Sequence, residues 1–405
     1  MTIRMDEGAA ELLDTLHRAG YAAYVVGGCV RDSLLGLTPH DWDLCTSALP
    51  QQGMELFGEE KCIPTGLQHG TVTVKQGGGL YEITTFRTEG TYTDGRHPDE
   101  VHFVPDVRED LARRDFTINA MAYNAKEGLI DPFGGQADLQ RGILRAVGVP
   151  HQRFTEDALR ILRLYRFAAR FGFSIDPPTA QAAQELCAHL DCVSVERIEE
   201  ELAKLLSAPA PAAYLDKKIL LVILPELSSE ALAAAKPVVD ACPAGEQALP
   251  VRLAALLLSL GEDGTRRTLR RLRCSNACIE ETAVLVREVV SGVPVSLNIY
   301  ARRLLGKYNL CTVQRLAALG TALQPEHAAD FAALSELAER LDADGVCCRV
   351  SQLAVNGRDL MAAGVPAGPG IRKVLEALLD GVIREEYPNE RQALLAAVHG
   401  NQFSA

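Results

Sequence analysis

The fold is decided by the stretch Tyr24-Val-Val-Gly-Gly-Cys-Val-Arg-Asp-Ser-Leu-Leu-Gly-Leu-Thr-Pro-His-Asp-Trp-Asp-Leu-Cys-Thr-Ser47. An apolar, strand-like run ends in Gly27-Gly28, a short helix-like segment carries Arg31, and an Asp-Trp-Asp triplet follows. Successive side chains of a strand point to opposite faces, so we expect Asp41 and Asp43 to project together.

This pair of carboxylates indicates chemistry on phosphate. Mg²⁺ prefers oxygen ligands and lets substrate phosphates complete its shell. Two such ions stabilise the attacking and leaving oxygens of a displacement at phosphorus. Gly27 and Gly28 carry no side chain, so a phosphate can approach the backbone and the N–H groups that open the next helix. Either motif alone is more often a plain turn or a solvated strand end, but both within about twenty residues predict a metal-dependent nucleotidyl-transfer site.

Length and composition describe an ordinary globular protein. The chain has 405 residues, 47% of them hydrophobic and 23% charged, and about two to four compact units are expected. No apolar run approaches the ~20 residues that span a bilayer, and the N-terminus lacks the apolar core of a secretion signal. The eleven cysteines show no zinc-site spacing, which fits reduced, mostly buried thiols. We therefore expect a cytoplasmic protein.

The charge is unevenly distributed. A net charge of −12 argues against a protein that coats nucleic acid with its whole surface. Within 141–170, however, the only acidic residues are Glu156 and Asp157. Seven arginines lie there: Arg141, Arg145, Arg153, Arg160, Arg163, Arg166 and Arg170. A second cluster follows at 266–273. This distribution predicts a polyanion bound along a narrow strip.

The periodicity changes along the chain. Strand and helix patterns mix up to about residue 135, which predicts an α/β or α+β head domain. Almost every later segment has a helical period. We expect the following division: a catalytic head at 1–138, a helical neck at 139–207, a helical body at 208–325 and a helical tail at 326–405. The polar segment 87–98 is expected to be a long loop.

One later helix carries most of the first arginine cluster. Thr155 is a good N-cap, and Glu156 and Asp157 suit the positive helix end. We expect the helix to run to Arg170. Its apolar residues leave four charged ones on the opposite side: Asp157, Arg160, Arg163 and Arg166.

Three separated motifs can now be combined. They are Gly27-Gly28…Arg31…Asp41-x-Asp43, then Arg113-Arg-Asp-Phe116, then Glu156-Asp-Ala-Leu-Arg160. In this order they resemble the class II tRNA nucleotidyltransferase / poly(A) polymerase family, and most of all its bacterial CCA-adding members. The resemblance runs nearly end to end and includes the segment 353–360.

The resemblance implies a fold and a set of roles. The head would be a polymerase-β-like nucleotidyltransferase, followed by all-α neck, body and tail. Asp41 and Asp43 would hold two catalytic Mg²⁺ ions. A further group would bind nucleotide: Gly28, Arg31, Arg114, Asp157, Arg160, Arg163 and Arg166. The implied partners are the 3′ end of tRNA, CTP and ATP; no protein partner can be inferred, and none of the sequence suggests a membrane.

The residues suggest how bases are chosen. Asp157 and Arg160, three positions apart on one helix, place an acceptor beside a forked donor. Cytosine and adenine each offer an exocyclic amine beside a ring-nitrogen acceptor, whereas uracil and guanine place a carbonyl where the amine would be. A carboxylate that faces a carbonyl leaves both acceptors unpaired, at ~1–3 kcal/mol per group. This pair therefore predicts selection of C and A without a template.

Alternatives and departures remain. Leu256-Leu-Leu-Ser259 stands where many family members have Leu-Leu-His-Asp, so we expect no second metal site. The 87–98 loop resembles one that A-adding members keep, which argues against a CC-only enzyme. An A-adding or poly(A)-polymerising relative is the second reading, and a catalytically idle RNA-binding module is the third. Glu82 is a candidate third carboxylate, although an exposed strand position is the favoured interpretation.

Overall fold

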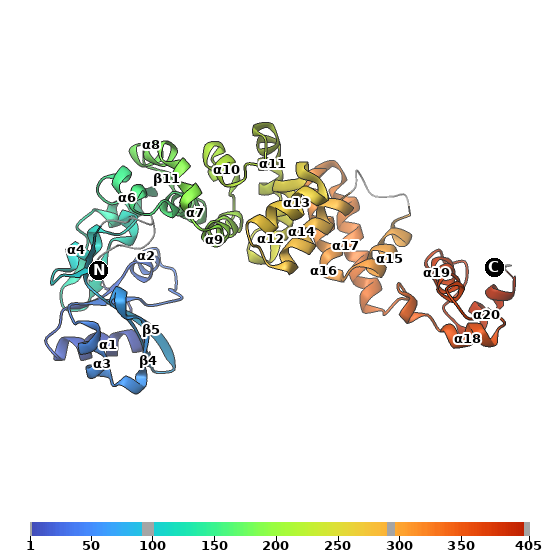
Figure 1. The fold of residues 1–405 in the computed structure, drawn as a ribbon, viewed down its shortest axis with the longest axis horizontal. Helices are drawn as coiled ribbons and strands as arrows, with labels where there is room; N and C mark the ends of the chain where they lie inside the picture. The colour runs from blue at the N-terminus through green and yellow to red at the C-terminus, as the bar shows by residue number, and fades with distance from the viewer. Residues whose placement is uncertain (1, 91–100, 290–295, 401–405) are drawn as a thin grey trace. The chain divides into compact units, whose positions relative to one another are not determined.

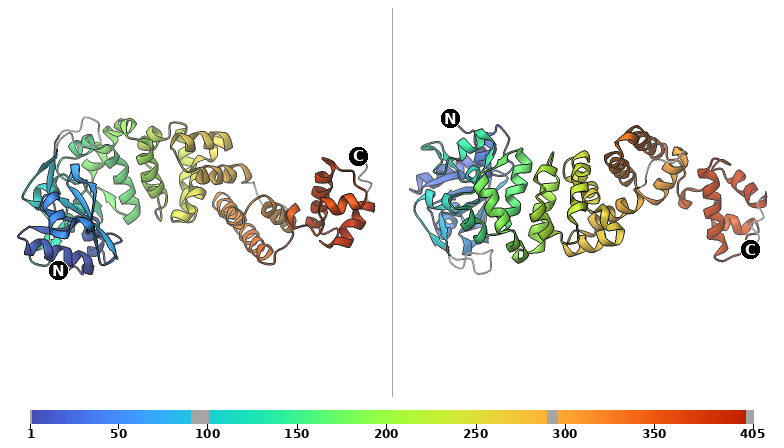
Figure 2. Two further views of the ribbon diagram at one scale, coloured as in Figure 1. Left: turned by 60° about the horizontal axis from the view of Figure 1, so that its bottom comes forward. Right: turned by 90° about the horizontal axis from the view of Figure 1, so that it is seen from above.

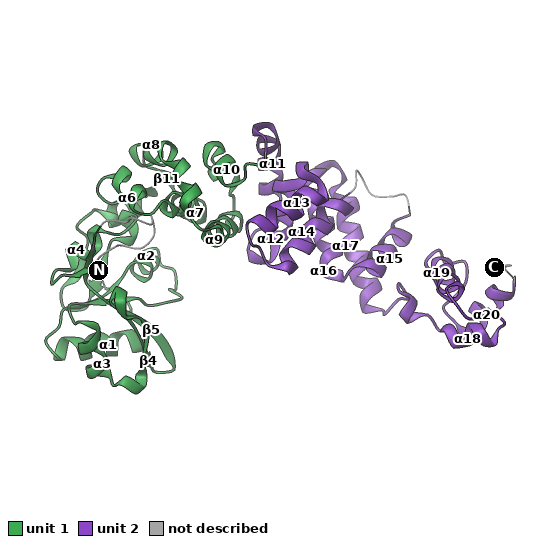
Figure 3. Cartoon of the chain, in the orientation of Figure 1, with its two compact units in different colours: residues 1–225 green, residues 226–405 purple. Residues whose placement is uncertain are grey.

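The structure is a computed structural model that describes residues 2–90, 101–289 and 296–400. The chain divides into two compact units, Met1–Pro225 and Glu226–Ala405 (Figure 3). Each unit is taken by itself below. Most of the predicted 87–98 loop lies outside the described residues.

A seven-stranded mixed sheet forms the centre of the first unit. The strands are β1 (Ala23–Val26), β2 (Leu44–Thr46), β3 (Cys62–Gly66), β4 (Thr71–Gln76), β5 (Gly79–Thr85), β8 (Ala122–Asn124) and β9 (Gly128–Ile130). Their order is β3-β4-β5-β2-β1-β8-β9. β2 and β5 are parallel, and the other neighbours are antiparallel. The sheet therefore places the start of β2 beside the end of β1 and the middle of β5.

Helices cover both faces of this sheet. α1 (Glu7–Arg18) and α3 (Pro50–Phe57) pack on one face (Figure 1). On the other face, Tyr24, Val26 and Cys45 form a buried cluster with Leu111 of α4 (Val107–Ala112). This division follows the alternation of side chains along a strand. Val25 and its partner Leu44 alternate with the residues of this cluster, so they are buried on the opposite face.

Short elements connect the sheet to the site. They are α2 (Gly28–Leu34), the 3₁₀-helix η3 (Thr117–Asn119) and α5 (Gly135–Arg141). β6 (Arg87–Glu89) pairs with β7 (Val101–Phe103), so the first residues of the expected loop belong to a strand instead. The prediction missed this strand because its partner lies beyond the polar segment.

The helix expected from Thr155 to Arg170 is two helices, α6 (Pro150–Glu156) and α7 (Leu159–Phe171). Thr155 does not cap a helix; its hydroxyl donates to the carbonyl of His151. Asp157 has an extended backbone (φ −143°, ψ 104°), and its carboxylate accepts from the N–H of Leu159 at 3.1 Å. Asp157 therefore ends α6 and accepts from the first N–H of α7, so it does not share a helical face with Arg160.

The first unit ends in further helices. They are α8 (Pro177–Glu185), α9 (Val195–Leu206) and α10 (Lys217–Ile223), with β10 (Ile143–Leu144) parallel to β11 (Ser174–Ile175). α7 and α9 pack against each other. Beyond β11, every regular element in the described part of the chain is helical (Figure 2).

The second unit is built from helices alone in its described residues. They are α11 (Ser229–Ala241), α12 (Leu249–Leu257), α13 (Gly261–Arg271), α14 (Asn276–Glu288), α15 (Leu297–Lys307), α16 (Leu310–Leu323), α17 (Ala328–Ala343), α18 (Gly357–Ala362), α19 (Gly370–Ile383) and α20 (Arg391–Gly400). Leu360, Leu378 and Leu394 belong to a small separate core of α18–α20. No helix among the described residues has the length and hydropathy needed to cross a membrane.

Leu111 tests the core that holds α4 on the sheet. It is fully buried, whereas Leu80 on β5 is 65% exposed. We expect Leu111→Ala to lower the free energy of unfolding by about 2–5 kcal/mol, because truncation leaves a cavity in a packed cluster. Leu80→Ala, the matched control, should change it by less than about 0.5 kcal/mol. Chemical denaturation of both variants measures the difference, and equal effects would contradict this description of the core.

Candidate active site

The carboxylate pair lies where β1 ends and β2 begins. Asp41 and Asp43 are exposed and directly precede Leu44, the first residue of β2. They were expected inside the strand, and the structure corrects this. The carbonyl of Asp43 nevertheless accepts from the N–H of Val26 at 2.9 Å, so the β1–β2 ladder fixes its backbone.

Glu82 is the nearest further carboxylate that affects this pair. The parallel register sets Leu44 opposite Ile83, which places Glu82 beside Asp43. The surrounding protein raises the pKa of the Asp43 carboxyl even though the residue is exposed; Arg114 lowers it, and the charges of Glu82 and Asp41 raise it. Within 2–90, 101–289 and 296–400, no three His, Cys, Asp or Glu side chains are grouped to hold a metal. Glu82 is exposed and acts on Asp43 through its charge, and its role as a third carboxylate stays a hypothesis.

Gly27 lets an arginine approach the backbone. Its φ of +77° is in the region that favours glycine, and a Cβ there would lie 2.9 Å from Nη1 of Arg114. Nε of Arg114 is buried without a hydrogen-bond partner in the structure. A buried, unpaired donor costs about 1–3 kcal/mol. Together with the influence of Arg114 on Asp43, this donor indicates an anion site at the end of β1.

Asp110 holds the two arginines of the Arg113-Arg114 pair. Its buried carboxylate accepts from Nε of Arg113 at 3.0 Å, and Nη2 of Arg114 lies at 3.4 Å. Burial alone would raise the pKa of Asp110, but the two guanidinium groups outweigh it and keep the pKa low. The carboxylate of Asp110 therefore stays charged and anchors the guanidinium of Arg114.

Arg31 is buried beneath the Gly27-Gly28 turn. It is 4% exposed, and Nε donates to Asp32 at 2.8 Å. Nη1 donates to Asn119 at 2.6 Å, and the guanidinium lies over the ring of Phe171, 4.9 Å from its centroid. These contacts describe a residue that supports the turn. The direct triphosphate contact predicted for Arg31 stays a prediction.

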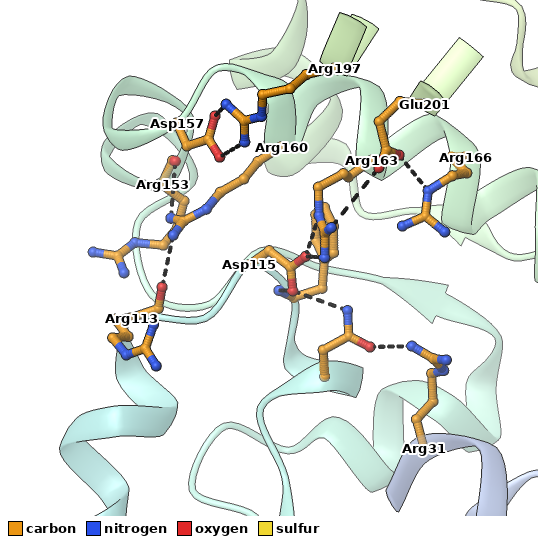
Figure 4. A network of polar contacts seen from close by, with 12 residues as sticks. Arg31, Arg113, Asp115, Arg153, Asp157, Arg160, Arg163, Arg166, Arg197 and Glu201 are labelled. Atoms are coloured by element: carbon orange, nitrogen blue, oxygen red, sulfur yellow. Dashed lines mark hydrogen bonds and ion pairs between the residues drawn. The ribbon is translucent and has the colours of Figure 1, made fainter. Parts of the chain in front are cut away.

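A polar network joins the head to the neck (Figure 4). Both Nε and Nη2 of Arg163 donate to Asp115, at 2.9 and 2.7 Å. Asp115 also accepts from Asn119 at 3.0 Å, and Asn119 in turn accepts from Arg31. Glu201 of α9 accepts from Nε of Arg166. Nη1 of Arg163 also lies 4.0 Å from Oε1 of Glu201, so the network continues from α2 to α9.

Arg160 is held by backbone carbonyls. Nη1 donates to Glu156 at 2.7 Å and to the carbonyl of Arg153 at 3.2 Å. Nη2 donates to the carbonyl of Arg113 at 3.0 Å. Arg160 is 9% exposed, so its position is fixed before any ligand binds.

The composition of the first arginine cluster predicted a free cationic strip. The structure instead shows that these arginines are largely paired. Most members pair with carboxylates, several of them far away in sequence. The pairs are Arg145 with Asp138 and Asp176, Arg153 and Arg160 with Glu156, Arg163 with Asp115, Arg166 with Glu201, and Arg170 with Asp32. Folding therefore neutralises charge that appears unopposed in the sequence.

Asp157 has a partner that the sequence did not reveal. Arg197 of α9 donates through Nη2 to Oδ2 at 2.8 Å and through Nη1 to Oδ1 at 3.3 Å. The forty residues between them carry no signal for this pair. Glu201 was missed for the same reason, whereas Asp110, four residues before Arg114, has a spacing that could have found it.

Comparisons with known proteins agree with this geometry. The protein-family model described as "Poly A polymerase head domain" matches residues 23–145. "Probable RNA and SrmB- binding site of polymerase A" matches 172–230, and "tRNA nucleotidyltransferase domain 2 putative" matches 251–398. The sheet and these matches define the protein as a nucleotidyltransferase of the poly(A) polymerase class, and they confirm the predicted fold class.

The relatives narrow the class. The CCA-adding enzyme of Lactiplantibacillus plantarum is 38% identical over 396 residues, covering 96% of this chain and 95% of the relative. That of Geobacillus stearothermophilus is 36% identical, covering 96% and 95%. The structure of the Bacillus stearothermophilus CCA-adding enzyme in complex with CTP superimposes with a TM-score of 0.80 at 32% identity, covering 98% of both chains. The chain belongs to the family of CCA-adding enzymes.

Asp115 gives a test of the network by pH. Although burial opposes ionisation, Arg163 and Asn119 hold the pKa of Asp115 well below its ordinary value of about 3.9. The unfolded chain therefore takes up the proton first as pH falls, so this group's contribution is complete above pH ~5 and declines below pH ~4. We expect Asp115→Asn to lower the free energy of unfolding by about 3 kcal/mol at pH 7, since Arg163 loses its buried partner.

The deficit relative to the unsubstituted protein should shrink between pH 5 and pH 3, measured by urea unfolding at each pH. The matched control is Asp14→Asn, because Asp14 lies on the exposed face of α1 with its side chain 60% exposed. That variant should track the unsubstituted protein at every pH. A deficit for Asp115→Asn that stays constant down to pH 3 would show that ionisation of Asp115 does not stabilise the fold.

Proposed function

We propose that this protein adds C, C and A to the 3′ end of tRNA, using CTP and ATP and no template. In each step the 3′-hydroxyl of the RNA attacks the α-phosphate of the nucleotide, and pyrophosphate leaves. One observation carries the proposal. The backbone of Asp43 is bonded to the end of β1, next to Gly27 and the buried, unpaired Nε of Arg114, and the charges of Arg114 and Asp41 both act on the Asp43 carboxyl.

The two carboxylates suit Mg²⁺. This ion binds proteins through one or two carboxylates and leaves other positions to water and substrate phosphates. Desolvation raises the pKa of Asp43, and the charges of Glu82 and Asp41 raise it further, so these carboxylates lie close enough for their charges to interact. When bound there, Mg²⁺ (two ions are expected) supplies Lewis-acid stabilisation of charge at the reacting phosphate. Asp41 and Asp43 are the residues that hold it.

The chain's own residues divide the remaining work. Arg114 donates to the triphosphate through Nε, which has no acceptor among the described residues, and Gly27 and Gly28 leave room for the phosphates. Asp157 accepts from the exocyclic amine of C or A, and Arg160 donates to the ring nitrogen. Arg163 and Arg166 line the pocket through the Asp115 and Glu201 network, with Arg31 supporting the turn.

Extension of tRNA transcripts tests the whole proposal. Transcripts that end before C, CC or CCA would be offered CTP and ATP, separately and together, with Mg²⁺. We expect addition of C, C and then A, followed by a stop. Long A tails would instead identify a poly(A)-polymerising or A-adding relative. No addition on any transcript would leave an RNA-binding module and refute the proposal.

The carboxylate pair is expected to be indispensable. Asp41→Ala or Asp43→Ala should reduce incorporation of C by at least about 10³-fold, because the metal site loses half of its protein ligands. The melting temperature should stay within a few degrees of the unsubstituted value, since both residues are exposed. Asp14→Ala is the control and should add C normally. Substantial turnover by either site variant with Mg²⁺ present would remove that residue from the metal role.

Asp157 is expected to set base selectivity. Asp157→Ala should lower the ratio of kcat/KM for CTP over UTP by about 10-fold or more, since the carboxylate no longer penalises the uracil carbonyl. Steady-state incorporation of each of the four nucleotides measures this. Unchanged preference for C and A over U and G would refute base reading by Asp157.

The division into head (1–138), neck (139–207), body (208–325) and tail (326–405), with the tail contacting tRNA, belongs to this proposal. So does the cytoplasmic location. The relative from Thermotoga maritima, solved as a complex with tRNA, shares the fold at a TM-score of 0.65 and 22% identity.

A further inference from the structure

α9 presents opposite charges to α7 on one helical face. Arg197 and Glu201 are four residues apart, so their side chains lie one above the other. Arg197 binds Asp157 just before α7, and Glu201 binds Arg166 further along α7. Figure 4 shows both contacts side by side on the neck. α9 therefore supplies a charged partner both for Asp157, just before α7, and for Arg166 on α7.

We propose that Arg197 is a specificity-positioning residue, which orients the carboxylate of Asp157 so that one oxygen faces the exocyclic amine of the incoming base. The inference rests on the base selection proposed above and extends it. Arg197 acts through Asp157 and makes no contact with the nucleotide. The class of ligand it favours is a nucleoside triphosphate whose base has an amine beside an unprotonated ring nitrogen.

Hydrogen-bond accounting carries the argument. A carboxylate has about four acceptor positions on its two oxygens. Oδ1 of Asp157 accepts from the N–H of Leu159 at 3.1 Å and from Nη1 of Arg197 at 3.3 Å. Oδ2 accepts from Nη2 of Arg197 at 2.8 Å. One acceptor position therefore remains, on Oδ2. It can accept a hydrogen bond from the amine of a base, but it has no hydrogen to donate to a base carbonyl.

Arg197 also fixes the orientation of the Asp157 carboxylate, which the nucleotide would otherwise have to fix when it binds. Asp157 lies on extended backbone between two helices, where the N–H of Leu159 also donates to its carboxylate. The planar guanidinium holds both oxygens at once, which fixes the plane of the carboxylate. The two side chains are 16% and 24% exposed, so water competes weakly for the pair. A preorganised acceptor lowers the cost of binding the correct base.

Arg197→Met tests the inference because it keeps the length of the side chain and deletes the fork. We expect the ratio of kcat/KM for CTP over UTP to fall about tenfold, mainly through a higher KM for CTP, while kcat/KM for UTP changes less than about twofold. Arg197→Lys keeps the charge but makes a single contact, so its ratio of kcat/KM for CTP over UTP should lie between those of the unsubstituted protein and Arg197→Met. Lys204→Met removes a cation from the same helix, where Lys204 pairs with the exposed Glu200. That control should behave as the unsubstituted protein.

A double-mutant cycle separates positioning from support of the fold. If Arg197 acts through Asp157, the double variant Asp157→Ala/Arg197→Met should have the same selectivity as Asp157→Ala alone. A further loss in the double variant would overturn the inference. So would a fall in kcat/KM by one common factor for all four nucleotides.

The remaining outcomes are also decisive. If Arg197→Met does not fold by its melting curve, Arg197→Lys decides, and selectivity equal to that of the unsubstituted protein would overturn the inference. If Asp157→Ala loses selectivity while folded Arg197→Met keeps it, the inference alone fails. If Asp157→Ala keeps its selectivity, base reading and the inference fail together. If the unsubstituted protein adds no C or A to tRNA, the proposed function itself has failed.

Discussion

The ion pair between Asp115 and Arg163 is the contact on which the arrangement of the first unit depends. Asp115 follows α4 and Arg163 lies on α7, and two hydrogen bonds join them. Removing both charges from water is costly unless each is paired and its remaining groups are bonded. Asn119 and Glu201 meet that requirement from either side. The buried charges can thus be satisfied in one arrangement of sheet and helix, which is a source of specificity in the fold.

The same requirement explains why a strongly acidic protein carries so many clustered arginines. Charge that looks like an exposed track in the sequence is mostly matched inside the fold, by Asp32, Asp115, Asp138, Asp176 and Glu201. Paired arginines lose some attraction for a distant polyanion because their charge is compensated. They gain fixed positions, and donors fixed before binding need no reorganisation when charge develops on a substrate.

What the sequence could predict was local. The Gly27-Gly28 turn was predicted correctly, because glycine freedom acts over a few residues, whereas strand alternation placed Asp41 and Asp43 inside a strand that begins only at Leu44. The continuous helix from Thr155 was wrong, since Asp157 offers its own carboxylate to the backbone and so competes with helix. The partners of Asp157 and Arg166 come from α9, thirty-five to forty residues on. No periodicity carries such pairings, so a spacing argument assigned these side chains to solvent or ligand.

The backbone at Arg113 and Arg114 joins the two halves of the site. The carbonyl of Arg113 accepts from Arg160, the proposed base-reading residue, and the guanidinium of Arg114, the proposed phosphate ligand, lies against Gly27. Asp110 holds both residues from within α4. A shift of Arg160 must therefore strain the carbonyl of Arg113, one residue before Arg114. A shift of Arg114 must likewise strain the Arg113 carbonyl that holds Arg160. In the proposed function, one peptide unit would therefore couple base choice to phosphate alignment, and transfer without a template would depend on which base is bound.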